Sequence, residues 1–310
     1  MTSASVGVAP VKIAVIGAGM MGARHAKCVA NHSGAALAAI VDPDDERRNT
    51  LAAEFRCTAY DIIAPLVGQV DAAIVAVPTA VHTEIAAVLL AAGIPCLVEK
   101  PFVSSQAEGE YLIRAARNRG AALQVGHIER FNPAIVALLA RVTDPSDIRA
   151  MTGRRISGAS ARVTDIDVVM DLMVHDIDAV LALKRQPVVH IDATGDANHA
   201  QAQITFADAS VADLTASRIH PVRIRDLRVF MGDTGLEVDY VARTLTEIEI
   251  GGDGNSISTS QPVQPGDALT AQLDAFITAV HGGPVTVPAT DAMAVMDVAW
   301  RVQRALGLTA

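Results

Sequence analysis

The sequence is poor in aromatic residues and in clustered positive charge, and each shortage excludes a class of protein. Aromatic side chains make up 3% of the 310 residues, so Ala, Val, Ile and Leu must fill the core of a chain that is 51% hydrophobic. The net charge is −9 and no run of Lys and Arg is present, whereas phosphate backbones bind to clustered basic residues. We therefore expect no nucleic-acid partner.

We also expect neither a membrane-spanning run nor a secretion signal. Its most hydrophobic stretch, Ile85–Val98, is broken by Gly93 and Pro95 and is shorter than the roughly 18 to 20 residues that span a bilayer. It predicts a buried helix, a turn and a buried strand, and no membrane association. Residues 1–10 have neither the charge nor the hydrophobic core of a signal peptide, and are expected to form a loose tail.

Cysteine is scarce as well. Cys28, Cys57 and Cys96 are odd in number, lie far apart and have no spacing typical of metal ligands. We expect three buried, reduced thiols and no metal site. Reduced thiols are typical of the cytoplasm, which is the predicted compartment.

What the sequence does contain is a regular alternation of strand-like and helical segments up to residue 125. Strands are expected at Val11–Ile16, Ala36–Val41, Ala72–Val77, Cys96–Glu99 and Ala122–Val125, and helices at Met21–Ala30, Asp44–Glu54, Thr83–Ala92 and Ser104–Arg119. This alternation predicts an α/β domain over residues 1–125, built on a doubly wound parallel sheet.

The pattern changes over residues 126–310, where alternating hydrophobic and polar residues indicate hairpins. Strands are expected at Gln201–Phe206, Val211–Ile219, Leu227–Met231 and Leu236–Tyr240, a loop at residues 251–266, and helices at Ala268–Val280 and Thr290–Leu306. The turn Gly232–Gly235 is a strong hairpin signal. We expect an α+β domain with a mostly antiparallel open sheet, one face of which is free to pack on helices or on another subunit.

The segment from Gly17 to Gly22, GAGMMG, joins the first strand to the first helix. Gly17 permits a tight turn, Gly19 lets a pyrophosphate approach the backbone, and Gly22 lets helix and strand pack closely. The N–H groups of Met20 and Met21 would face the phosphates at the helix N-terminus. An ordinary glycine-rich turn is the alternative, but the buried strand before it and the helix after it favour a dinucleotide-binding Rossmann domain.

Asp42 ends the second strand, 20 residues after Gly22. Its carboxylate would accept hydrogen bonds from the adenosine ribose and would repel a 2′-phosphate, which favours NAD over NADP. Arg47 and Arg48 follow on the next helix, and either could turn toward a 2′-phosphate. NADP therefore stays open as the less favoured cofactor.

Two later segments indicate chemistry. Glu99–Lys100–Pro101 lies at the C-terminal end of the fourth strand, the end that faces the ligand in open α/β sheets, where Lys100 could hold a substrate hydroxyl near the nicotinamide. An ordinary surface lysine is the alternative.

The second segment carries Asp171 and His175, which share a face if the segment is helical. A carboxylate orients the ring and raises the histidine pKa, as a general base requires. A structural histidine is one alternative. A metal site of His175, Asp176 and Asp178 is another, disfavoured because consecutive helical residues point apart.

In this order and at these separations, the glycine turn, Glu99–Lys100–Pro101 and Asp171-x-x-x-His175 resemble the Gfo/Idh/MocA oxidoreductases. The resemblance covers nearly the whole chain after the tail. It implies oxidation of a sugar or polyol, a C-terminal domain that forms homodimers or homotetramers, Lys100 as the lysine that positions the substrate, and His175 as the base supported by Asp171. The implied cofactor contacts are Gly17, Gly19, Met20, Met21, Gly22, Asp42, Arg47, Pro78, Thr79, His82, Glu99 and Lys100.

Residues 125–133, VGHIERFNP, and Asp171–Asp178 are more similar to the branch of the family that oxidises UDP-N-acetylglucosamine at the sugar C3, on a route toward lipid A. The implied substrate contacts are Lys100, Arg130, Asn132, Arg162, Asp171 and His175, with Arg130 facing the diphosphate. Asn132 and Pro133 also have the pattern of a helix start, which is compatible with a substrate contact. Arg154 and Arg155 are further available cations.

Two other functions stay open. One is a dehydrogenase of inositol or of another sugar or polyol. The other is a non-catalytic regulator that binds NAD(P), against which the presence of Lys100, Asp171 and His175 argues.

Overall fold

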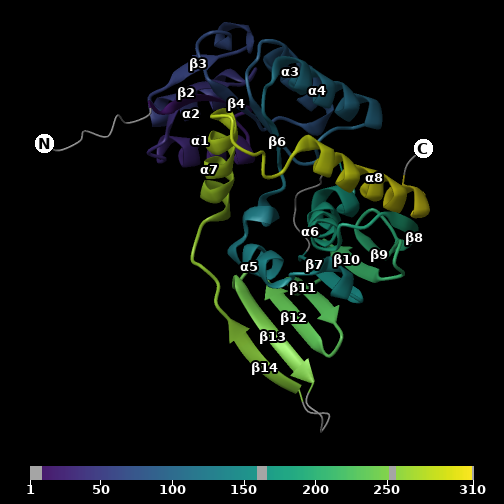
Figure 1. Ribbon diagram of the computed structural model, residues 1–310. Coiled ribbons are helices and arrows are strands. Elements are labelled where there is room, and N and C mark those ends of the chain that lie inside the picture. The colour runs from purple at the N-terminus through teal and green to yellow at the C-terminus, as the bar shows by residue number, and fades with distance from the viewer. Residues whose placement is uncertain (1–8, 159–165, 251–255, 309–310) are drawn as a thin grey trace, which may run out of the picture. The chain divides into compact units, whose positions relative to one another are not determined.

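The computed structural model describes residues 9–158, 166–250 and 256–308, which form two compact units (Figure 1). The first unit holds the chain up to Gly126 and also residues 269–293. The second unit holds residues 127–268 and the chain from residue 294 onward. Most of the expected tail, residues 1–8, lies outside the described residues.

The first unit is built on a parallel sheet of six strands in the order β3-β2-β1-β4-β5-β6. The strands are β1 (Val11–Ile16), β2 (Ala35–Val41), β3 (Thr58–Tyr60), β4 (Ala72–Val75), β5 (Cys96–Glu99) and β6 (Leu123–Gly126). The helices are α1 (Met20–Ala30), α2 (Asp45–Phe55), α3 (His82–Ala91), α4 (Gln106–Arg119) and α7 (Ala268–Val280). The predicted doubly wound sheet is confirmed. The strand order reverses between β1 and β4, where such sheets bind their ligands.

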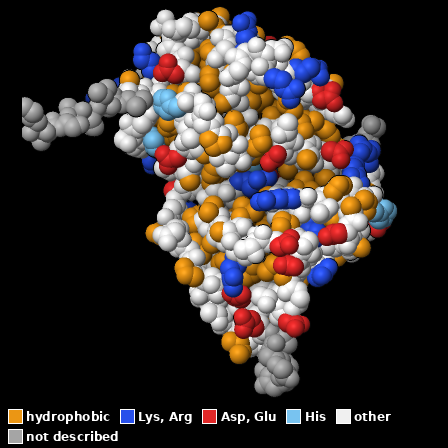
Figure 2. Space-filling view, viewed as in Figure 1, with side chains coloured by type: hydrophobic (Ala, Val, Ile, Leu, Met, Phe, Trp, Pro, Cys, Tyr) orange, Lys and Arg blue, Asp and Glu red, His pale blue; other side chains and the backbone are white. Residues whose placement is uncertain are grey.

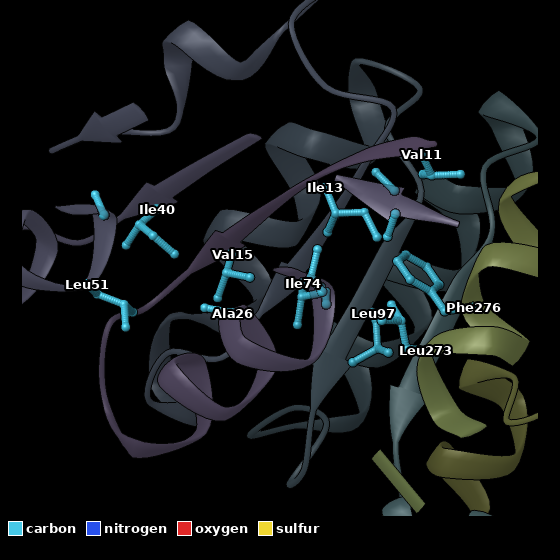
Figure 3. Packing of buried hydrophobic residues seen from close by; sticks show 14 residues of the cluster. Val11, Ile13, Val15, Ala26, Ile40, Leu51, Ile74, Leu97, Leu273 and Phe276 are labelled. Atoms are coloured by element: carbon cyan, nitrogen blue, oxygen red, sulfur yellow. The ribbon is translucent and has the colours of Figure 1, made fainter. Parts of the chain in front are cut away.

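The core of this unit shows why α7 belongs to it. Ile13, Ile74 and Leu97 of the sheet are buried in one cluster with Leu273 and Phe276 of α7 (Figure 3). The chain therefore returns to the first unit after completing most of the second.

The second unit contains an eight-stranded sheet in the order β14-β13-β12-β11-β7-β10-β9-β8. The strands are β7 (Ala150–Ile156), β8 (Val188–Gly195), β9 (His199–Phe206), β10 (Val211–Ser217), β11 (Ile224–Met231), β12 (Thr234–Asp239), β13 (Thr244–Ile250) and β14 (Ser256–Gln261). Among the strands described here, only β7 and β10 pair in parallel, so the predicted, mostly antiparallel sheet is confirmed. The main helical segments are η3 (Ile128–Phe131), α5 (Pro133–Arg141), η5 (Val169–Met173), α6 (Val174–Lys184) and α8 (Ala289–Ala305).

Two expectations for this unit are wrong. Part of the expected loop at 251–266 is strand β14, whose residues are polar except for Ile257 and almost all exposed, so that no alternation marks it. The hairpin turn between β11 and β12 is shorter than expected, because Met231 already pairs with Thr234. Gly232 takes the positive φ, 58°, that such a two-residue turn requires.

The membrane and cysteine expectations can be compared with the described chain. Ile85–Val98 forms the end of α3, a turn and the start of β5, as predicted. Cys96 is buried, but Cys28 and Cys57 are partly exposed, so the expectation of three buried thiols is wrong for two of them; none of the three forms a disulfide. No helix among the described residues is long and apolar enough to cross a membrane. On the face in Figure 2, acidic and basic side chains lie interspersed among hydrophobic ones.

Candidate active site

The glycine turn after β1 has two tight positions and one open position. A Cβ on Gly17, where φ is +99°, would lie 2.4 Å from the carbonyl oxygen of Ala76. A Cβ on Gly22 would lie 1.7 Å from the carbonyl oxygen of Gly17. A Cβ on Gly19 would meet nothing within 4 Å. The first and third glycines therefore shape the turn, and the middle one leaves its backbone open to a ligand.

The first N–H groups of α1 receive no hydrogen bond acceptor from the side chain of the N-cap residue. Gly19 is the N-cap and has no side chain to accept from the first N–H groups, and the first turn carries no acid. By contrast, α4 begins with a complete capping box formed by Ser105 and Glu108. Unsatisfied N–H groups and the helix dipole favour an anion at this end, so this cradle fits the pyrophosphate of a dinucleotide.

Asp42 ties the glycine turn to the end of β2. Its side chain is nearly buried, and Oδ2 accepts a hydrogen bond of 2.7 Å from the N–H of Ala18, while Oδ1 accepts one of 2.9 Å from the N–H of Asp44. Each carboxylate oxygen can accept more than one hydrogen bond. Asp42 therefore stabilises the turn and keeps acceptor capacity for ribose hydroxyls.

The two arginines that follow are paired with carboxylates of the same segment. Arg48 donates to the carbonyl oxygen of Asp42 at 2.6 Å and forms an ion pair with Asp45. Nε of Arg47 lies 3.5 Å from Oδ2 of Asp44, and the Arg47 side chain is 65% exposed. Neither cation is without a local acidic partner.

A buried histidine–glutamate pair joins the helix of the glycine turn to the strand that ends at Lys100. Nε2 of His25, on α1, lies 2.7 Å from Oε1 of Glu99, and both side chains are nearly buried. Oε2 of Glu99 also accepts from the N–H of Lys100 at 3.3 Å. A Cβ on Gly126, in the neighbouring strand, would lie 2.9 Å from Oε1 of Glu99, so this glycine makes room for the carboxylate.

His82 fastens the loops that follow β4 and β5. Its Nε2 lies 2.8 Å from the carbonyl oxygen of Val77, and its Nδ1 lies 3.1 Å from that of Phe102. The side chain is buried, and burial lowers the pKa of His82. Pro78 and Thr79 are more exposed on the same loop. His82 therefore has a structural role, because it holds the loops after β4 and β5 together.

In the second unit, Asp171 lies within a helix irregularity and His175 lies just after it. Asp171 belongs to the π-helical segment η5, and His175 to the first turn of α6; both are half-buried. The regular helix expected here is therefore wrong over five residues. Short π segments widen a helix and are frequent at functional sites.

The residue after His175 is held by a buried ion pair. Arg155 of β7 donates to both oxygens of Asp176 at 2.9 Å, and also to Oε1 of Glu129 at 2.9 Å. Its guanidinium stacks over the ring of Tyr240, 4.6 Å from the centroid. Burial lowers the pKa of Arg155, but the two carboxylates outweigh that effect and hold the pKa above its usual value. Arg155 is therefore a charged anchor for the start of α6.

Arg130 makes a second anchor for α6, because its Nε donates to Oδ2 of Asp178 at 2.9 Å. With Asp176 and Asp178 both engaged by arginines, the alternative metal site with His175 lacks two of its ligands. Within the described chain, no group of three or more His, Cys, Asp and Glu residues is arranged to hold a metal.

Asn132 forms the N-cap of α5, as its pattern with Pro133 predicted. Its Oδ1 accepts from the N–H of Ala134 at 3.1 Å. Its Nδ2 donates to Glu129 and to the carbonyl oxygen of Tyr240, at 3.0 and 3.2 Å. The whole amide is thus engaged inside the unit, and a substrate contact stays a prediction.

The remaining cations from the sequence differ in their placement. Arg154 points to the opposite face of the sheet from Arg155 and forms a two-point ion pair with Asp226. Arg162 lies outside the described residues.

Comparison with known proteins supports the reading of both units. A family model described as "Oxidoreductase family, NAD-binding Rossmann fold" (Gfo/Idh/MocA) matches residues 11–127. UDP-N-acetylglucosamine 3-dehydrogenase of Acidithiobacillus ferrooxidans is 35% identical over 283 residues, which cover 86% of this chain and 87% of that protein. The chain belongs to the Gfo/Idh/MocA family of oxidoreductases.

A solved structure of the Acidithiobacillus ferrooxidans enzyme has a TM-score of 0.89 to this family member, covering 96% of this chain and 98% of the other. A myo-inositol dehydrogenase of Streptomyces leeuwenhoekii is 28% identical, with coverage of 88% and 89%. Relatives of this family member therefore include dehydrogenases of a nucleotide sugar and of a polyol.

Sequence reasoning on this family member missed several supporting residues. His25 had a usable signal, since it follows Gly22 by three residues and faces the core side of α1. Glu129, Tyr240 and Arg225 had none, because their positions beside Arg155 and Asn132 depend on strand register and on contacts between distant parts of the chain.

Proposed function

We propose that this protein oxidises UDP-N-acetylglucosamine at the sugar C3 with NAD, giving the 3-keto sugar, NADH and a proton. The observation that carries the proposal is the 35% identity to UDP-N-acetylglucosamine 3-dehydrogenase over 86% of the chain. Lys100, Asp171 and His175 supply the polar groups that the reaction requires.

Each of these three residues has a distinct proposed role in the reaction. His175, supported by Asp171, takes the proton of the C3 hydroxyl. Lys100, fixed at its backbone by Glu99, binds the same oxygen as its charge changes. A bound nicotinamide would supply the acceptor for the C3 hydrogen and its electron pair. A C–H bond and an O–H bond are thus broken and a C=O bond is formed.

NAD is the proposed cofactor because carboxylates outnumber arginines beside the glycine turn. Asp42, Asp44 and Asp45 stand against Arg47 and Arg48, and each arginine already has an acidic partner. A 2′-phosphate would add negative charge to a segment that is already acidic. We also propose that NAD contacts Met20, Met21, Pro78 and Thr79.

We further propose a cytoplasmic homodimer or homotetramer that assembles through the eight-stranded sheet and contributes to lipid A synthesis. Helices α5 and α6 pack against strands on one side of this sheet. The opposite side exposes Arg154, Arg228 and Phe230, and this side is the proposed interface.

The test is formation of NADH from NAD with UDP-N-acetylglucosamine, UDP-glucose and myo-inositol as separate substrates. We expect the highest kcat/KM with UDP-N-acetylglucosamine. Activity with inositol alone would instead support the polyol alternative, which the 28% identity to a myo-inositol dehydrogenase favours. Binding of NAD without turnover of any sugar would support the regulator.

A further inference from the structure

Arg225 lies beside the buried anchor of α6. In the antiparallel pairing of β11 with β7, Arg225 is directly opposite Arg155. Residues opposite each other in such a pair point to the same face, and Arg155 points to α6, where it binds Asp176. Arg225 therefore lies on the sheet face that binds the first turn of α6, the turn that contains His175 and Asp176.

The charges around Arg225 do not balance. Arg155 donates hydrogen bonds of 2.9 Å to both nearby carboxylates, those of Asp176 and Glu129. Nε of Arg225 is buried and has no hydrogen-bond partner in the part of the chain that the structure describes. Arg223, two residues before Arg225 in the chain, is exposed, and its positive charge acts on Arg225. Three guanidinium groups thus face two carboxylates.

This imbalance is unfavourable in the free protein. Burial lowers the pKa of Arg225, and the positive charges of Arg155 and Arg223 lower it further. A buried donor without a partner costs free energy, and a charged one costs more. Such a group is what a site for an anion provides before the anion binds, because the fork of a guanidinium matches two oxygens of a phosphate.

We propose that Arg225, together with Arg223, binds the diphosphate of the nucleotide-sugar substrate. The inference rests on the proposed function, and it assigns the diphosphate to cations that the sequence did not single out. Arg130 and Arg155 are engaged by carboxylates, and Arg154 faces the other side of the sheet. Arg225 and Arg223 have no such acidic partner within the described residues.

The experiment is calorimetric titration of the full-length protein, saturated with NAD, with UDP and with uridine. We expect Arg225→Gln to weaken UDP binding by roughly 10- to 100-fold, the loss of a charge-assisted contact, while uridine binding is unchanged. Arg225→Lys keeps the charge but not the fork, and should lose less. Arg223→Gln, at an exposed position, should also weaken UDP binding without affecting folding.

Arg228→Gln is the matched control, because Arg228 lies on the same strand but on the opposite face, paired with Glu237 at 2.9 Å. It should bind UDP as the wild type does. The thermal midpoint of Arg225→Gln should equal or exceed that of the wild type, since an unmatched charge is removed; a lower midpoint with unchanged UDP affinity would show a structural role and overturn the inference.

The outcomes separate this inference from the proposed function. If the wild type binds UDP through Arg225 but does not oxidise UDP-N-acetylglucosamine, only the proposed function fails. If the wild type oxidises UDP-N-acetylglucosamine and Arg225→Gln leaves its KM unchanged, only this inference fails. Absence of UDP binding by the wild type, or an equal loss in Arg228→Gln, would also overturn the inference.

Discussion

Asp42 has two tasks that a single substitution can separate. Its carboxylate holds the N–H of Ala18 in the glycine turn, and by the proposal it also binds the ribose hydroxyls of NAD. Asp42→Ala should reduce NAD affinity by about tenfold or more, and NADP affinity by less, because the repulsion of the 2′-phosphate is lost with the carboxylate. Fluorescence titration with both dinucleotides measures the ratio.

Glu54→Ala is the control for Asp42, since Glu54 is exposed in the last turn of α2 and is not one of the carboxylates beside the glycine turn. It should leave the preference for NAD intact. Equal losses of NAD and NADP affinity in Asp42→Ala would mean that Asp42 serves the turn alone.

Lys100 and His175 should affect turnover and not cofactor binding. Loss of a positioned proton-transfer group slows a reaction by roughly 100- to 10,000-fold, so Lys100→Met and His175→Ala should lose at least 100-fold in kcat. NAD affinity should stay within a factor of about two, since the glycine turn is untouched. Lys27→Met, at an exposed position of α1, is the control. Near-normal kcat in either variant would contradict the assigned roles.

The glycine turn can be tested as an element, because its glycines differ in the space around them. Gly19→Ala adds a methyl group in open space, so the protein should fold with an unchanged thermal midpoint while NAD affinity falls as the methyl group meets the pyrophosphate. Gly22→Ala places a Cβ against the carbonyl oxygen of Gly17, so both the thermal midpoint and NAD affinity should fall. A lower thermal midpoint in Gly19→Ala, or an unchanged one in Gly22→Ala, would contradict this account of the turn.

Helix α6 is held at both ends, and its C-terminal end gives a pH-dependent prediction. The buried Lys184 donates to the carbonyl oxygens of Pro145 and Ile148 at 3.0 and 2.8 Å and forms an ion pair with Asp208. Hydrogen bonds from Lys184 and then Ser210 lower the pKa of Asp208 from its usual 3.8 to about 2. A lowered carboxyl pKa stabilises the folded state above the usual value, and this stabilisation is lost as the pH falls toward about 2.

Asp208→Asn should therefore unfold at a lower temperature than the wild type at pH 7. The difference should shrink as the pH falls below about 4 and be mostly lost near pH 2, where about half of the folded molecules carry a neutral Asp208. Thermal unfolding followed by circular dichroism across this range measures it. Asp213→Asn, on the exposed side of β10, is the control. A difference as large at pH 2 as at pH 7 would show that Asp208 acts through packing rather than through its charge.

At the scale of the elements, the features that the sequence predicts correctly are those marked by a few consecutive residues. Buried parallel strands, the glycine turn and the Asn132 cap were predicted, because each depends on a few consecutive residues. Strand β3 has three residues and β14 has a single hydrophobic residue, Ile257, so neither carries a hydrophobic pattern. Arg154 and Arg155 seemed equivalent in sequence, yet they point to opposite faces of β7. Only the register with β11 shows that Arg225 accompanies Arg155.

At the scale of the whole molecule, the chain does not divide at a single boundary. The sequence suggests a division at residue 125, but residues 269–293 return to the first unit. Nothing local marks this return, since α7 is an ordinary amphipathic helix whose partners Ile74 and Leu97 are nearly two hundred residues away. The first unit carries the glycine turn, Asp42 and Lys100. The second unit carries Asp171, His175, Arg223 and Arg225. The proposed reaction therefore requires residues of both units.

The central claim is hydride transfer from C3 of UDP-N-acetylglucosamine to NAD, and isotope transfer tests it most directly. The protein is incubated with NAD and with UDP-N-acetylglucosamine that carries deuterium at the sugar C3 or, as a control, at C4, and the NADH is analysed by mass spectrometry. The account predicts deuterated NADH from the C3-labelled substrate and unlabelled NADH from the C4-labelled one. Unlabelled NADH from the C3-labelled sugar, or no NADH from either, would contradict it.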